Sequence, residues 1–340
     1  MSEPPSKLIT CNIMGGLGNQ LFQIATTIAY AIQNKCIFVF PYSVEVFKNR
    51  FSYWHSFLVS LRRFTTENPK FGKTNLGLDA LPKYFERGFH FNPLPAFEVS
   101  VSLQGYFQSY LYFDKEKESF FKFIRLREQQ EKVYADYTYY FTPFRIKDAQ
   151  PVKLFSFNSA LEEGVLNEKR FIPWSEEKEQ NPITVSLHFR LGDYHFLPDF
   201  HPILSPLYYE NALVHLLSKL PPSTNKNNTV RILYFCEEKD HLNVLETIEY
   251  LKRRLLSLPY AYNVVFVKVA DEIEDWKQML LMSLCDHHII ANSTFSWWGA
   301  YFHYPSKEHY VIYPSVWFGP KLQDKNVSDL FPKSWIKITY

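Results

Sequence analysis

The sequence lacks the features of several large classes of protein. No stretch approaches the ~20 apolar residues that a membrane-spanning helix needs, and Met1–Pro5 contains no apolar core of a signal peptide. The formal net charge is only +2, whereas a nucleic-acid-binding protein usually has a clustered basic face. We therefore expect a soluble, cytoplasmic protein that has no membrane span and binds no nucleic acid.

Cysteine is also scarce. The four cysteines have neither the spacing of metal ligands nor a paired framework that would indicate disulfides. Cys11, Cys36 and Cys236 lie in apolar, strand-like runs, which predicts buried free thiols. Free thiols suit a reducing compartment, in agreement with a cytoplasmic location.

Aromatic residues are abundant by contrast. They make up 18% of the chain, with 31 Phe and 23 Tyr. Such an excess fits a surface that binds sugars, and it equally fits a core filled with aromatic side chains. The 340 residues are enough for one large domain or two ordinary ones.

Strands and helices alternate in two regions of the chain. In the first, the apolar run Leu8–Ile13 is followed by the glycine-rich turn Gly15–Gln20, by apolar residues at helical spacing, and by the strand Cys36–Pro41. The second region, Ile183–Tyr313, contains five strand–helix steps. Parallel strands need such crossovers, so the pattern predicts doubly wound parallel α/β sheets.

The loop His188–Tyr194 follows a strand over residues 183–187 and carries His, Arg, Gly and Asp. Ligands of open α/β sheets bind outside the carboxyl ends of the strands. Arg190 offers a planar set of donors suited to a phosphate or carboxylate. The loop therefore predicts a site for an anionic ligand, such as a nucleotide.

A second loop, Asn292–Gly299, follows the fourth strand of the same region. Ser293 or Thr294 can cap the next helix, whose free N–H groups would then face the same crevice as Arg190. Together the two loops predict a diphosphate site. The alternative is an ordinary helix cap, and core packing is favoured for Trp297 and Trp298.

The turn Gly15–Gln20 has no Gly-Lys-Ser/Thr, so it is not a Walker loop. It also lacks the third glycine of the dinucleotide fingerprint. Two interpretations of this segment remain open: a tight turn, or a turn whose Asn19 and Gln20 contact a polar ligand.

Four segments, taken in order over residues 8–304, resemble the α-1,2-fucosyltransferases of glycosyltransferase family eleven. They are Gly15–Gln23, Leu103–Ser109, His188–Tyr194, and Met282–Asp286 running into Asn292–Ala300. The resemblance implies a GT-B-type α/β fold with two Rossmann-like domains and a cleft between them. It implies transfer of L-fucose from GDP-β-L-fucose to the 2-hydroxyl group of a galactoside, with inversion and without a metal.

The resemblance also divides the chain. It implies an acceptor-side domain over residues 1–178, a donor-binding domain over 179–315, and a tail over 316–340 that packs back on the domains. Two positions depart from the family pattern. Leu191 stands where a second arginine is usual, and Gln278 stands where the family often has an acidic residue, with Asp275 nearly one turn earlier.

The resemblance and the two loops together indicate the site residues. Arg190 is expected to stabilise the charge of the leaving phosphate, and Asp193 to act as general base or to hold Arg190 or the loop backbone. Glu237 and Glu238 could contact the donor or form a solvated charge pair. The expected donor-binding residues are His188, Arg190, Gly192, Asn292, Ser293, Thr294, Phe295, Ser296, Gly16, Gly18, Asn19, Gln20 and Asp275, and the expected acceptor-binding residues are Tyr106 and Gln108.

Two other functions remain open from the sequence. The same fold could use another nucleotide sugar, since a diphosphate site does not read the sugar. The chain could also be a glycan-binding protein without activity, although the presence of Arg190 and Asp193 argues against it.

Overall fold

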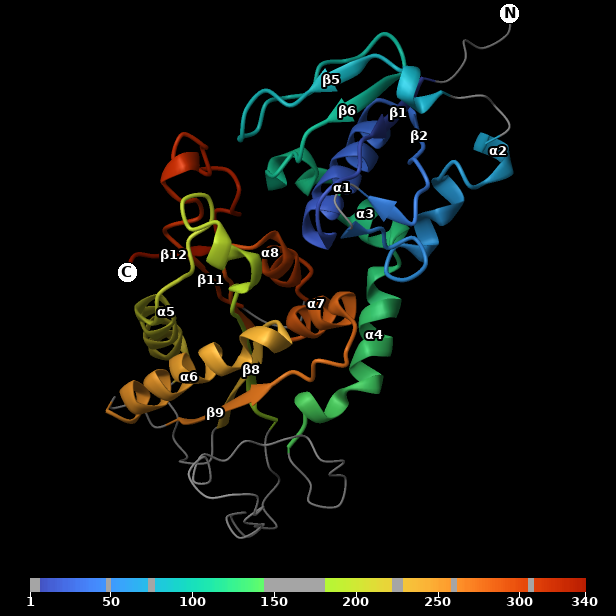
Figure 1. Cartoon of the computed structure of the whole chain (residues 1–340). Coiled ribbons are helices and arrows are strands. Elements are labelled where there is room, and N and C mark those ends of the chain that lie inside the picture. Colours follow the sequence, from blue (N-terminus) through green and yellow to red (C-terminus); the bar gives the residue numbers. More distant parts are fainter. Residues whose placement is uncertain are drawn as a thin grey trace, which may run out of the picture.

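The computed structural model describes residues 7–46, 50–72, 77–143, 181–221, 229–257, 262–304 and 309–340. Two parallel sheets flanked by helices make up this part of the chain (Figure 1). The predicted α/β fold with two parallel, Rossmann-like sheets is therefore confirmed. The expected boundary at 178/179 lies outside the described residues.

The first sheet has four strands in the order β2-β1-β6-β5, all parallel. Its strands are β1 (Leu8–Cys11), β2 (Ile37–Phe38), β5 (Lys83–Phe85) and β6 (Val101–Gln104). An antiparallel pair of strands, β3 (Glu45–Val46) and β4 (Arg50–Phe51), lies outside this sheet. The helices of this half are α1 (Leu17–Gln33), α2 (Pro69–Gly72), α3 (Lys117–Phe123) and α4 (Leu126–Asp136).

The second sheet has six parallel strands in the order β12-β11-β10-β7-β8-β9. They are β7 (Ile183–His188), β8 (Thr229–Phe235), β9 (Asn263–Lys268), β10 (His287–Ile289), β11 (Val311–Pro314) and β12 (Ile336–Ile338). This is the Rossmann strand order, and the order reverses between β7 and β10. The predicted doubly wound sheet is thus confirmed, and β12 adds an edge strand, at residues 336–338, for which the sequence showed no pattern.

Helices cover both faces of the second sheet. They are α5 (Pro206–Lys219), α6 (His241–Leu256), α7 (Asp275–Ser283) and α8 (Thr294–Tyr301). Alternate residues of β8 point to opposite faces of the sheet. Ile232 packs in the hydrophobic cluster that contains α5 and α6, whereas Leu233 packs in the cluster that contains α7 and α8. The face with α7 and α8 is turned toward the first sheet (Figure 1).

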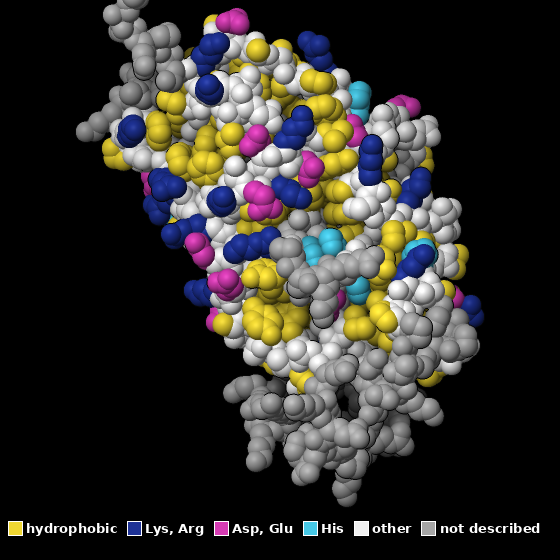
Figure 2. Space-filling view, turned by 180° about the vertical axis from the view of Figure 1, so that it is seen from behind, with side chains coloured by type: hydrophobic (Ala, Val, Ile, Leu, Met, Phe, Trp, Pro, Cys, Tyr) yellow, Lys and Arg dark blue, Asp and Glu magenta, His cyan; other side chains and the backbone are white. Residues whose placement is uncertain are grey.

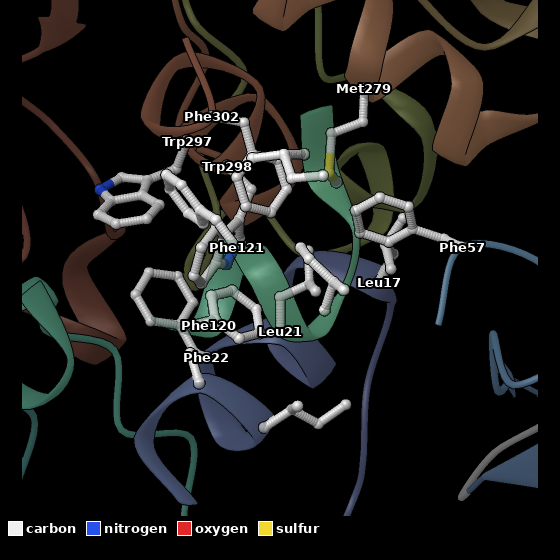
Figure 3. Close-up of a cluster of buried hydrophobic side chains, with 14 of the residues drawn as sticks. Leu17, Leu21, Phe22, Phe57, Phe120, Phe121, Met279, Trp297, Trp298 and Phe302 are labelled. Carbon is white, nitrogen blue, oxygen red and sulfur yellow. The ribbon is translucent and has the colours of Figure 1, made fainter. Parts of the chain in front are cut away.

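One continuous core joins the two halves. It contains Phe22 of α1, Phe121 of α3 and Met279 of α7 together with Trp297 and Trp298 of α8 (Figure 3). Both tryptophans are fully buried, so the prediction of core packing for them is confirmed. The rings of Phe22 and Trp297 lie 4.6 Å apart between centroids, and many of the abundant aromatic residues pack in this core in the same way.

Lys and Arg side chains are interspersed with Asp and Glu on the face that Figure 2 shows. Among the described residues, no helix has the length and apolar character needed to cross a bilayer.

All four cysteines are free. Cys11 is buried as expected, but Cys36 and Cys236 are partly exposed because they lie just outside the strands.

Candidate functional site

The two predicted loops lie together at the point where the strand order of the second sheet reverses. His188 is the last residue of β7, and Asn292 follows β10, its neighbour in the sheet. The hydroxyl group of Tyr194 in the first loop donates a hydrogen bond to the carbonyl oxygen of Asn292, at 3.0 Å. This convergence was predicted, and we call the region between the two loops, at the carboxyl ends of parallel strands, the crevice.

Arg190 of the first loop is held by two carboxylates. Its guanidinium group forms ion pairs with Asp193 and Glu237, and it lies over the ring of Tyr194 at 5.0 Å from the centroid. Glu237 is also paired with Lys239, at 2.8 Å. Glu237 is therefore a partner of Arg190 rather than half of a solvated pair with Glu238. An incoming phosphate would compete with these carboxylates for Arg190.

Gly192 allows the loop to turn tightly beside Arg190. Its φ of +46° is in the left-handed region, and a Cβ here would lie 2.6 Å from Oε1 of Glu237. Its N–H donates to Oδ2 of Asp240 at 2.6 Å, and Asp240 is buried. Sequence reasoning did not identify Asp240, which fixes the loop backbone from the next strand–helix connection.

His188 is a buried residue with an unused polar atom. Its Nδ1 has no hydrogen-bond partner among the described residues, and its ring faces that of Phe295 at 5.7 Å. Burial, with a smaller effect from the charge of Arg190, lowers the pKa of His188 to about 3. The imidazole is therefore neutral near pH 7. A buried polar atom without a partner inside a crevice is available to a ligand.

The N-terminus of α8 lies next to the first loop, where the ring of Phe295 contacts that of His188. The hydroxyl oxygen of Ser293 caps the helix by accepting from the N–H of Phe295 at 3.3 Å, and Ser296 donates back to the carbonyl oxygen of Ser293. The amide of Asn292 donates to the carbonyl oxygens of Pro202, at 2.9 Å, and Trp317. Asn292 thus fixes neighbouring loops, while the helix end brings partial positive charge toward Arg190.

The glycine-rich turn connects the two halves of the molecule. The indole N–H of Trp298 donates to the carbonyl oxygen of Gly18, at 2.9 Å. The side-chain oxygen of Asn19 accepts from the hydroxyl group of Thr294, at 2.9 Å, and from the amide of Gln108, at 2.8 Å. These predicted ligand-binding residues therefore form the contact between α1 and α8.

The remaining predicted residues lie around this contact. The amide of Gln20 donates to the carbonyl oxygens of Gly15 and Phe51, whereas Gly16 has open space where a side chain would be. Tyr106 is partly exposed after β6. Asp275, the first residue of α7, accepts a hydrogen bond from the hydroxyl group of Tyr53.

Arg50 is a cation that the first half contributes to the crevice. It lies on β4, and its Nη2 is 3.7 Å from Oδ2 of Asp193. A chain of alternating charges therefore runs from Lys239 through Glu237, Arg190 and Asp193 to Arg50. No pattern in the sequence indicated Arg50, because the pair joins residues that only the packing of the two halves brings together.

The chain is similar in sequence to known proteins. Residues 235–339 match the family model described as Glycosyl transferase family 11. The chain is 28% identical over 338 residues to the O-antigen biosynthesis glycosyltransferase WbnK of Escherichia coli, covering 96% of this chain and 99% of the relative. It is 29% identical over 163 residues to an alpha-1,2-colitosyltransferase of Escherichia coli, covering 46% of this chain and 47% of the relative.

Two solved structures resemble the chain more distantly. A mutant of Arabidopsis thaliana FUT1 in complex with GDP has a TM-score of 0.42 and 11% identity, over 91% of this chain and 71% of that one. POFUT1 in complex with GDP has a TM-score of 0.44 and 14% identity, over 92% of this chain and 99% of that one.

Proposed function

We propose that this chain, whose residues 235–339 match the model of glycosyl transferase family 11, moves L-fucose from GDP-β-L-fucose to the 2-hydroxyl group of a galactoside. The product would carry an α-1,2 linkage, with inversion at the anomeric carbon. One observation carries the proposal: Arg190 and the N-terminus of α8 converge at the strand-order reversal of a Rossmann sheet. That arrangement suits the diphosphate of a nucleotide sugar.

In the proposed reaction the acceptor hydroxyl attacks C1 of fucose while GDP leaves from the opposite face. The sugar passes through an oxocarbenium-like state, as in glycoside hydrolysis. Negative charge develops on the β-phosphate as the bond breaks. Arg190 and the free N–H groups of α8 would stabilise that charge, and one such donor is worth about 3–4 kcal/mol of transition-state stabilisation.

Asp193 is the proposed general base. One of its oxygens is paired with Arg190 and the other lies 3.7 Å from Arg50, and the side chain is 46% exposed. An accessible carboxylate beside the leaving group can accept the proton of the attacking hydroxyl. In the competing role Asp193 only positions Arg190, and this role predicts a different kinetic effect of its removal.

We also propose that the reaction needs no metal ion. The negative charge of a bound diphosphate must be neutralised, and a divalent cation is one group that can do this. Here the side chain of Arg190 and the end of α8 supply positive charge at the expected position of the β-phosphate.

A different donor sugar is the second candidate function. The relative named alpha-1,2-colitosyltransferase favours it, since that name specifies the same linkage with another sugar. A site for the diphosphate does not by itself select the sugar, so the proposed diphosphate-binding residues are compatible with either donor.

Nucleotide release from a panel of nucleotide sugars tests both candidates. The protein is incubated with each donor and with β-galactoside acceptors, with and without EDTA. Release of GDP from GDP-fucose alone, raised by acceptor and unaffected by EDTA, supports the first candidate. Release from another donor supports the second. Tight glycan binding without any release would instead indicate a glycan-binding protein and refute both.

A further inference from the structure

A cavity of about 480 Å³ opens beside the first sheet. Asn12, Ile13 and Met14, which directly follow β1, form one side of it, and Glu45 and Val46 of β3 form another. Trp54 also lines the cavity, and it is almost fully buried against Phe40. The cavity is therefore at the carboxyl ends of parallel strands, where ligands of α/β sheets bind.

The lining combines an apolar floor with two polar groups. Ile13, Met14, Val46 and Trp54 supply apolar surface, and within the described part of the chain the side chains of Asn12 and Glu45 form no hydrogen bond or ion pair. A pyranose ring has the matching chemistry, because its C–H face is apolar and its hydroxyl groups are polar. A carboxylate accepts hydrogen bonds from hydroxyl groups, and an amide can donate and accept.

The cavity is connected to the crevice of the second half by a short path. Val46 on its wall pairs with Arg50 of β4, whose guanidinium group lies 3.7 Å from Asp193. The hydrogen bond from Gln20 to the carbonyl oxygen of Phe51, at 2.8 Å, holds this strand pair against α1. The cavity is thus lined by the strand pair whose Arg50 reaches Asp193, in the loop with Arg190.

We propose that this cavity binds the sugar of the acceptor, with Glu45 and Asn12 bonding to its hydroxyl groups and with Met14 and Val46 against its apolar face. The proposal rests on the proposed function and assigns its acceptor site. It differs from the site expected at Tyr106 and Gln108, because the amide of Gln108 is bonded to Asn19.

Acceptor kinetics test the proposal. Rates are measured with GDP-fucose at saturation and methyl β-D-galactopyranoside as the varied acceptor, and release of GDP without acceptor is measured in parallel. Glu45→Gln should raise the KM for the acceptor by at least about 10-fold, from loss of a charged hydrogen-bond partner. Val46→Phe, which fills the cavity, should raise it further. The KM for GDP-fucose and the release of GDP without acceptor should not change.

Glu98→Gln is the matched control. Glu98 is an exposed carboxylate before β6, at the opposite end of the first sheet, and pairs with Lys7 at 3.5 Å. Its substitution should leave the KM for the acceptor unchanged. An unchanged acceptor KM in both Glu45→Gln and Val46→Phe would overturn the cavity proposal while leaving the proposed function intact.

A direct binding measurement separates the two proposals when no transfer is seen. If the wild-type protein releases no GDP from GDP-fucose with any galactoside, the proposed function fails. Saturation-transfer NMR with methyl β-D-galactopyranoside then decides the cavity on its own. Binding by the wild type that Val46→Phe abolishes supports the cavity, whereas binding that survives this substitution, or no binding by the wild type, overturns it.

Discussion

Replacing Gly18 by alanine adds one methyl group that has two opposite effects on the stability of the fold. Gly18 is in the first turn of α1, where alanine is favoured over glycine by up to about 1 kcal/mol. A Cβ at this position, however, would lie 2.5 Å from the carbonyl carbon of Thr294, where ordinary contact begins at 3.4 Å. The difference requires α1 and α8 to move apart by about 0.9 Å.

The size of the effect follows from the contacts at this position. Inserting a methyl group into a close-packed contact typically costs about 1–3 kcal/mol. The separation also stretches the hydrogen bonds from Trp298 to Gly18 and from Thr294 to Asn19, each worth about 1 kcal/mol. After the gain in helix propensity is subtracted, Gly18→Ala should lower the free energy of unfolding by about 2–4 kcal/mol.

Urea unfolding followed by tryptophan fluorescence and far-ultraviolet circular dichroism measures this change. Gly16→Ala is the control, since a Cβ there meets nothing within 4 Å and the position precedes the helix. It should change the free energy of unfolding by less than about 1 kcal/mol. A Gly18→Ala protein that is as stable as the wild type, or more stable, would refute the close contact between α1 and α8.

The other predictions concern the crevice and the buried histidines. Arg190→Ala should lower turnover at least about 100-fold, through loss of one donor to the leaving phosphate, and a near-normal rate would remove Arg190 from that role. Asp193→Asn should lower kcat at least about 100-fold with little change in the KM for GDP-fucose; a raised donor KM at normal kcat would indicate a positioning role instead. Burial lowers the pKa values of His188 and His303 to about 3 and of His287 to about 4, from an ordinary 6.5. The unfolded chain therefore binds more protons below pH 6.5, so stability present at pH 7.5 should fall by up to about 2 kcal/mol per histidine at pH 5, and equal urea midpoints at the two pH values would contradict this.

The sequence predicted the parts of the site that local patterns determine. The apolar run over residues 183–187 and the polar loop after it have a strand-end pattern that is visible without the structure. The cap at Ser293 is equally local, because a hydroxyl group before a helix bonds to a backbone N–H two residues later. The meeting of the two loops followed from parallel strand pairing, which brings carboxyl ends to one edge.

Contacts between distant segments could not be predicted in the same way. Asn19 and Thr294 are 275 residues apart, so the sequence showed two separate polar motifs where the structure has one contact. The pair of Arg50 with Asp193 and the bond from Gly192 to Asp240 likewise depend on packing. The strand β12 was missed because three residues at a sheet edge are too few to show a period.

The contact between α1 and α8 limits how such proteins can be recombined. Trp298 of α8 is bonded to Gly18 of α1, and the same helix begins at the crevice beside Arg190. A chimera that takes residues 1–143 from one relative and the remainder from another would pair an α1 with an α8 that did not evolve against it. Exchange of acceptor specificity between relatives should therefore transplant the strand pair β3–β4 and leave both helices from one parent.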